Sequence, residues 1–195
     1  MCNTTVYECY LQAKKKKFVW DYSLLLSMLE ISRQKHKVPV IQKQQHIVDR
    51  YQEARKNFTS AEEMVLTNEF RKDPTKRNLL ASNRFGVTGS DCDHFVWWDR
   101  DGNEKASDIR LQCASEKILS QFPIGHRFLI YRNPKVSRSV PNLYHLHVFV
   151  KREMGCEESK IDFIYEFEDE VFEEECHEIY VEWIENDENP FSSNS

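Results

Sequence analysis

Three histidines occupy predicted β-strands and could do chemistry. His145 and His147 alternate in NLYHLHVFV, and His94 begins the aromatic run His94–Trp98. Alternate side chains of a strand share one face, so His145 and His147 point the same way. Adjacent strands lie about 4.8 Å apart, within reach of a side chain. We therefore predict that the three imidazoles converge if the two strands are neighbours in suitable register.

An imidazole titrates near neutral pH, so this group could act as acid, base or anion contact. Three imidazoles could also bind a metal such as zinc. The plainer alternative is that they are half-buried polar residues on the face opposite Tyr144, Leu146, Val148 and Val150. We take His94, His145 and His147 as candidate catalytic residues and assign neither a metal nor a cofactor.

The alternating pair also resembles the late strand of the histidine-triad nucleotide hydrolases and transferases. In that family the third histidine of His-x-His-x-His is the nucleophile, whereas Phe149 stands at that position here. The resemblance therefore gives no support to hydrolysis through a histidine nucleophile. A histidine-triad-like hydrolase or transferase stays as the last of three alternatives.

Helices in the first half and strands in the second must position these residues. Apolar residues recur every three or four positions in the helical stretches, and β-branched or aromatic residues cluster in the strands. Ser60 and Glu63 form a capping box. The order strand, helix, strand, strand predicts a crossover followed by a neighbouring strand in one sheet. We expect an α+β domain with N-terminal helices packed on a small mixed sheet. Its expected helices are 22–33, 40–58, 60–70 and 107–122, its strands are 94–98, 127–131 and 144–150, and strand or helix stays open around 161–165.

Length and composition favour one packed core. The chain has 195 residues and 40% hydrophobic content, with only five Gly and six Pro, which argues against a disordered or fibrous class. The apolar run Ser23–Leu29 is far shorter than the roughly 20 residues that cross a bilayer, so no membrane partner is expected. Six cysteines without a Cys-x-x-Cys pair predict free thiols and a cytoplasmic protein, with the nucleus as a second location.

The charges are unevenly distributed. The segment 154–195 holds 15 Asp or Glu against one Lys, which leaves 26 Lys or Arg and 17 Asp or Glu in 1–153. The acidic end could fold onto the basic body, shield it from polyanions or recruit a basic partner. This asymmetry predicts a basic N-terminal extension at 1–21, a core domain at 22–152, an acidic segment at 153–185 and a disordered tail at 186–195.

Basic residues also gather beside two aromatic side chains near the third predicted strand. A groove for phosphate or nucleic acid would need such a pattern. It matches no nucleic-acid-binding motif, so a charged loop flanking the strands is favoured and a nucleic-acid partner is not expected. The basic residues are Arg132, Lys135, Arg138, Lys151 and Arg152, and the aromatic residues are Tyr131 and Tyr144.

Several short stretches together resemble a fungal-type family of unknown function that includes the N-acetylglucosamine-induced protein. The stretches are Ile47–Gln52, Asn83–Phe85, Asp93–Trp98, Tyr131–Pro134 and Ser137–Val150, and the family-like part spans about 40–152. The chain departs from the family at Gly86-Val87, where members tend to have Pro-Tyr. The resemblance implies a link to the amino-sugar response and no established reaction, and it suggests that His94, Asn133, His145 and His147 belong together.

Two functional hypotheses follow. The first is a pocket over the histidine face for a phosphorylated or amino-sugar-like small molecule, with Arg132, Asn133, Arg84 and Trp98 as candidate ligand-binding residues. The second is a non-enzymatic regulatory or adaptor protein that binds a basic partner through its acidic C-terminal segment.

Overall fold

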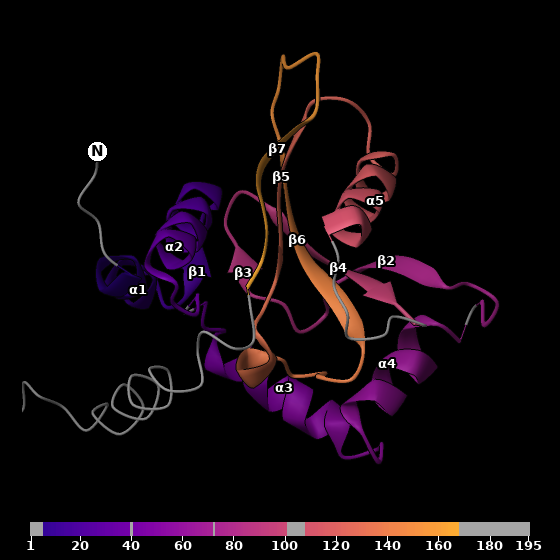
Figure 1. The fold of residues 1–195 in the computed structure, drawn as a ribbon. Coiled ribbons are helices and arrows are strands. Elements are labelled where there is room, and N and C mark those ends of the chain that lie inside the picture. The colour runs from indigo at the N-terminus through magenta and orange to yellow at the C-terminus, as the bar shows by residue number, and fades with distance from the viewer. Residues whose placement is uncertain (1–5, 40, 72, 101–107, 168–195) are drawn as a thin grey trace, which may run out of the picture.

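A five-stranded mixed sheet lies between helices in the computed structural model, which describes residues 6–39, 41–71, 73–100 and 108–167 (Figure 1). The helices are α1 (Val6–Lys15), α2 (Tyr22–Lys35), α3 (Gln45–Arg55), α4 (Ala61–Glu69), α5 (Asp108–Leu119) and the short 3-10 helix η1 (Lys135–Ser137). The strands are β1 (Val19–Trp20), β2 (Asn78–Ser82), β3 (Thr88–Gly89), β4 (Asp93–Asp99), β5 (His126–Arg132), β6 (Tyr144–Arg152) and β7 (Lys160–Glu166).

The sheet has the order β2-β4-β6-β5-β7, and β1 and β3 form a separate parallel pair. Strand β6 lies at the centre and runs antiparallel to both β4 and β5, whereas β7 runs parallel to β5. Strands β4 and β5 therefore run the same way and are joined through α5. The fold class is confirmed as α+β, and so is the expected crossover, with β6 inserted between its two strands.

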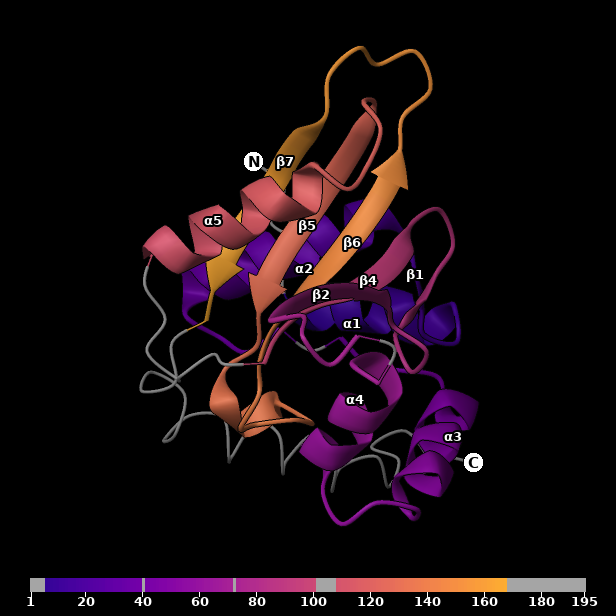
Figure 2. The same cartoon turned by 90° about the vertical axis from the view of Figure 1, so that its right-hand side faces the viewer.

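Both faces of the sheet are covered. Helix α5 packs on one face, where Ile118 joins Phe128 and Leu146 in a buried cluster. Helices α1 and α2 pack on the other face, against Leu129 and Phe149 (Figure 2). Helix α4 adds a smaller cluster at one end of that second face. The histidine face of β6, expected to lie opposite the core, is therefore also buried.

The predicted helix start at Ser60 is confirmed. The Ser60 hydroxyl accepts a hydrogen bond from the Glu63 amide, and the Glu63 carboxylate accepts from the amide and hydroxyl of Thr59. These contacts satisfy amides that have no partner inside the helix. Helix α2 begins in the same way, since the Asp21 carboxylate accepts from the Leu24 amide.

The core extends beyond residues 22–152 at both ends. Cys9 and Trp20, within the expected basic extension, are fully buried against α2. Phe163, within the expected acidic segment, is buried on β7, which resolves the open choice at 161–165 as a strand. The rest of that segment from residue 168, the expected tail at 186–195 and the expected start of the fourth helix at 107 lie outside the described residues.

Two other expectations concern chemistry and membranes. Cys9, Cys92, Cys113 and Cys156 are free thiols, as predicted for these four. In the part of the chain that the structure describes, no helix is both long and apolar enough to span a membrane.

Candidate functional site

The register of β4 and β6 brings the predicted histidines onto one face. His94 lies opposite Phe149, Val96 opposite His147, and Trp98 opposite His145. Adjacent rows are offset by two residues along each strand, so His94 and His147 are diagonal neighbours and their ring centroids lie 5.2 Å apart. The predicted convergence of the three histidines is confirmed for His94 and His147 by a direct hydrogen bond and for His145 by ring contact with His147 at 5.5 Å.

A directional chain of hydrogen bonds fixes the tautomers of His94 and His147. The Val87 amide donates to His94 Nδ1 at 3.2 Å, so the proton of the neutral ring sits on Nε2. That Nε2 donates to His147 Nδ1 at 3.0 Å, and the Asn83 Nδ2, 3.4 Å from the same Nε2, is then a contact between two donors and not a hydrogen bond. Neutral His147 then holds its own proton on Nε2. The two imidazoles are donor and acceptor to each other and do not jointly face a shared ion.

Asn133 ends this chain. Its side-chain Nδ2 lies 3.2 Å from His147 Nε2. The oxygen and nitrogen of an asparagine amide are told apart by their hydrogen-bond partners. Because this tautomer makes His147 Nε2 a donor, it requires the Asn133 amide to be turned over, with its oxygen in the place of Nδ2. The resemblance had grouped Asn133 with the histidines, and the structure places it there.

The loop before β4 is shaped around His94. A Cβ atom on Gly86 would lie 2.5 Å from His94 Nδ1, closer than atoms can approach. Glycine at this position lets the backbone approach the ring closely enough for the Val87 amide to donate to it. The departure from the family pattern at Gly86-Val87 thus has a physical use in this chain.

Burial keeps the three histidines uncharged. It lowers the pKa of His94 to about 3 and that of His145 to about 4, with the positive charge of Lys43 adding to the effect. The pKa of His147 is also well below its ordinary value because of burial and the neighbouring His94. The expected titration near neutral pH is therefore lost, and the rings are neutral hydrogen-bonding groups at pH 7.

His145 differs from the other two histidines in having an open ring nitrogen. Its Nδ1 donates to the Leu143 carbonyl at 2.8 Å, which leaves Nε2 as an acceptor. Among the described residues no hydrogen bond reaches that Nε2. The ring contacts the Trp98 ring, with the two centroids 5.0 Å apart, and both residues border a cavity.

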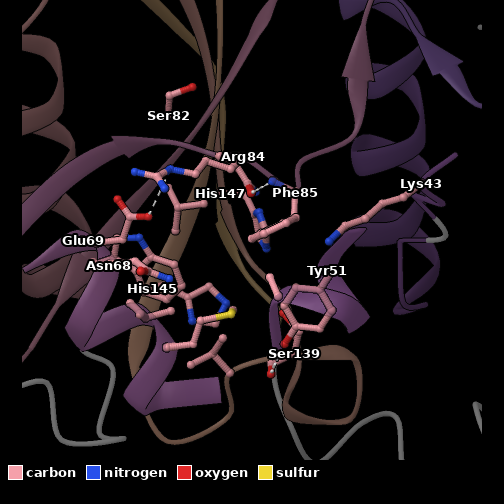
Figure 3. Close-up of a pocket in the computed structure, with 17 residues that line it drawn as sticks. Lys43, Tyr51, Asn68, Glu69, Ser82, Arg84, Phe85, Ser139, His145 and His147 are labelled. Carbon is pink, nitrogen blue, oxygen red and sulfur yellow. Dashed lines mark hydrogen bonds and ion pairs between the residues drawn. The ribbon is translucent and has the colours of Figure 1, made fainter. Parts of the chain in front are cut away.

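This cavity has a volume of about 180 Å³ and lies between the helices α3 and α4 and the sheet (Figure 3). Its floor is largely apolar, with Val65, Val96, Trp98 and Val140 among the lining residues. The polar lining residues are Lys43, Tyr51, Asn68, Glu69, Ser82, Asn83, Arg84, Ser139, His145 and His147.

Several polar groups at the cavity are paired with one another, whereas Lys43, the lining lysine, has no hydrogen bond or ion pair to a described residue. The Tyr51 hydroxyl donates to the Ser139 carbonyl at 3.5 Å, and Arg84 lies 3.8 Å from Glu69. Lys43 extends toward the cavity in Figure 3 and contacts the Tyr51 ring, 5.8 Å from its centroid. No hydrogen bond or ion pair joins it to a described residue, and burial lowers its pKa.

Arg132 lies apart from this site. It follows Tyr131 on β5, and Tyr131 faces His147, so alternation sends Arg132 to the α5 face. There its guanidinium carbon lies 4.5 Å from the ring centroid of Tyr144. The expectation that Arg132 and Asn133 hold one ligand together is not met, because the two side chains leave the sheet on opposite faces.

Of the other predicted residues, Trp98 and Arg84 border the cavity, whereas His94 lies behind His147 and outside the lining. No group of three or more metal-ligating side chains occurs among the described residues. The sequence pointed to none of Lys43, Tyr51 and Ser139 as site residues. Tyr51 and Ser139 fall within the family-like stretches Ile47–Gln52 and Ser137–Val150, whereas Lys43 lies in none of these stretches.

Comparison with known proteins adds little to this geometry. No protein-family model matches the chain, and no curated protein sequence does. A search of solved structures finds a crystal structure of HTC1 with 15% identity and a TM-score of 0.45 over 70% of this chain and 89% of that one. The fold and the site thus define an α+β protein with a buried histidine pair beside a small cavity, and a match at this TM-score assigns it no family or function.

Proposed function

We propose that the cavity beside His145 binds a phosphorylated or amino-sugar-like small molecule. One observation carries the proposal: the Nε2 acceptor of His145 and the Lys43 ammonium border the same apolar cavity, and neither has a partner among the described residues. A polar group left without a partner in a buried site costs free energy, which a bound ligand would recover.

The size and chemistry of the cavity favour one small polar ring. Its 180 Å³ is below the about 300–1,000 Å³ of pockets that hold drug-sized ligands. A hydroxyl could donate to His145, the C–H face of a sugar could pack on Trp98, and a phosphate could accept from Lys43 and Arg84. The amino-sugar part of the proposal rests on the resemblance to the N-acetylglucosamine-induced family.

A ligand panel tests the proposal on the full-length chain. Isothermal titration with amino sugars, their phosphates and nucleotides should find at least one ligand. Lys43→Met and His145→Phe should each weaken it about tenfold or more, as expected for one lost polar contact worth about 1.4 kcal/mol. The matched control is Lys56→Met, because Lys56 is 70% exposed and pairs with Glu53 away from the cavity. Absence of binding across the panel, or equal binding by all variants, would reject the proposal.

An adaptor function is the second proposal, and the acidic end supports it. The segment 168–195 contains 11 Asp or Glu and no Lys or Arg. Deleting the whole segment from residue 154 would also remove β7, so the test keeps the chain length and changes the 11 acids to their amides. Recovery of a basic partner from cells should then be lost while thermal unfolding still shows a folded body. Undiminished recovery would argue against the adaptor.

A histidine-triad-like hydrolase or transferase is the third proposal and has the weakest support. Phe149 holds the position of the nucleophile and stacks on His94 at 4.1 Å inside the core. Nucleotide turnover by the purified chain that disappears in both His145→Phe and His147→Phe would favour it. We also propose a cytoplasmic location, with the nucleus second, from the free cysteines; imaging of the tagged chain tests this.

A further inference from the structure

Arg132 is a buried cation without a counter-ion among the described residues. Its side chain lies on the α5 face, the residue is 4% exposed, and its Nε has no hydrogen-bond partner. No other hydrogen bond or ion pair reaches its guanidinium from the described part of the chain. A guanidinium cannot avoid this cost by losing its proton, because arginine stays protonated in proteins. A buried charge of this kind needs an anion close to it.

The neighbouring groups are already engaged. Arg110 also lies over the Tyr144 ring, 3.8 Å from its centroid, and donates to the Asp99 carboxylate at 2.7 Å. Glu166 is the cross-strand neighbour of Arg132 on β7, but its carboxylate accepts from the Tyr144 hydroxyl and forms no ion pair with the guanidinium. Burial and that hydrogen bond raise the pKa of Tyr144, so the phenol is not a negative counter-ion for Arg132. The ring face offers Arg132 only a cation–π contact.

The geometry points to an oxyanion site at Arg132, on the face of the sheet opposite the histidines. A carboxylate, phosphate or sulfate could pair with the guanidinium through two parallel hydrogen bonds, which is the geometry that an arginine favours. The sheet separates this site from the cavity beside His145, although the charge of Arg132 acts through it and helps to lower the pKa of His145.

The chain itself offers the nearest source of carboxylates. Strand β7 ends at Glu166, and the amide of Phe167 donates to the Arg132 carbonyl at 3.1 Å. The chain thus leaves the sheet beside Arg132 and continues into the acidic stretch 168–195. A free oxyanion is the other source with the same chemistry, and the experiment separates the two.

The test measures thermal unfolding of full-length protein with sodium sulfate or sodium chloride at equal ionic strength, so that general screening is the same. In a variant with the 11 acids of 168–195 changed to amides, sulfate at several times its dissociation constant should raise the midpoint by about 2–4 °C. Adding Arg132→Gln should abolish this rise. The matched control Arg152→Gln, at an exposed arginine at the far end of β6, should keep it.

The unmodified chain identifies the source of the anion. If it shows no sulfate response, its own carboxylates occupy the site; if it responds and Arg132→Gln removes the response, the site takes a free oxyanion. Arg132→Lys keeps the charge but loses the two parallel hydrogen bonds, so it should weaken the sulfate response. It replaces Arg132→Gln in the test if the Arg132→Gln protein does not fold. The inference is overturned if the sulfate response persists in both Arg132→Gln and Arg132→Lys. It is also overturned if none of the proteins responds to sulfate.

Discussion

The two faces of the sheet bury polar groups in opposite ways. On the histidine face, His94 and His147 are neutral and bond to each other at 3.0 Å. On the arginine face, which we define by Arg110, Arg132 and Tyr144, the two guanidinium groups are charged, and Arg110 donates to the Asp99 carboxylate at 2.7 Å. The sheet that separates the faces is one layer thick, so the difference lies in the side chains and not in the depth of burial.

Proton loss explains the contrast. A buried histidine can shed its charge because its ordinary pKa of 6.5 lies close to neutrality, and burial shifts it further down. An arginine cannot, so its burial demands a carboxylate or another anion. A sequence can therefore place histidines under a helix at modest cost, whereas each buried arginine implies a partner that must be found.

Breaking a charged pair should have the largest effect on stability. In Asp99→Asn, Arg110 loses the buried carboxylate that accepts its hydrogen bond, and Arg77 loses a contact at 3.6 Å. Removing one partner of a buried ion pair costs about 3–5 kcal/mol. Urea unfolding followed by circular dichroism should show a loss of that order.

The control for this prediction is an exposed pair of the same type. Asp73 lies 3.9 Å from Lys76, and both side chains are about half exposed. Asp73→Asn should cost less than about 1 kcal/mol. If the two substitutions cost the same, the charged groups of the arginine face would not be energetically distinct from the surface.

Breaking the neutral pair should cost less. His94→Phe keeps the ring shape but leaves the Val87 amide and His147 Nδ1 without their partner. One unsatisfied buried group costs about 1–3 kcal/mol, whereas replacing both partners by apolar groups can be nearly neutral. In urea unfolding, His94→Phe/His147→Phe should therefore lose less stability than the sum of the single variants. An additive result would mean that the two rings do not act as a pair.

The sequence predicted the central helices and strands of the fold better than the elements at the sheet edge and at the N-terminal end. Long periodic stretches gave α2, α3 and α4, and the aromatic runs gave β4, β5 and β6. Strand β2 was missed because it has five residues at the sheet edge, and four of them are only partly buried. Helix α1 was missed because two of the three buried residues in its described part, Cys9 and Ala13, are small and leave only Tyr10 as a large buried side chain before a run of lysines.

The candidate site was predicted in part, for a related reason. Alternation along β6 placed His145 and His147 on one face, and the pairing of β4 with β6 brought in His94. The same rule separates Arg132 from Asn133, although the two had been expected to act together. Lys43 precedes α3 in an irregular stretch, so only the tertiary fold could bring it to the cavity. The histidine face was expected to lie opposite the core, half-buried at most, but helices cover both sides of the sheet and bury it. Phe149, on the same face as His147 and His145, was the residue that indicated this.

The smallest expected effect is a change in the slope of stability against pH, about 1.4 kcal/mol per pH unit for one buried ring. The pKa is about 3 for folded His94 and about 4 for folded His145, below the 6.5 of an unfolded histidine, so the unfolded chain binds more protons between these values. Stability is therefore complete above pH 6.5 and falls as the pH drops toward 4. The lowered pKa values of Glu62 and Glu63 add a further loss of stability near and below their ordinary value of 4.5, equally in the unmodified chain and in His145→Phe, so the difference between the two slopes belongs to the histidine. We expect urea unfolding between pH 7 and 4.5 to give a free energy of unfolding that falls less steeply with decreasing pH in His145→Phe than in the unmodified chain. Equal slopes would mean that His145 is not a buried neutral group, and the contrast with the arginine face would not hold for it.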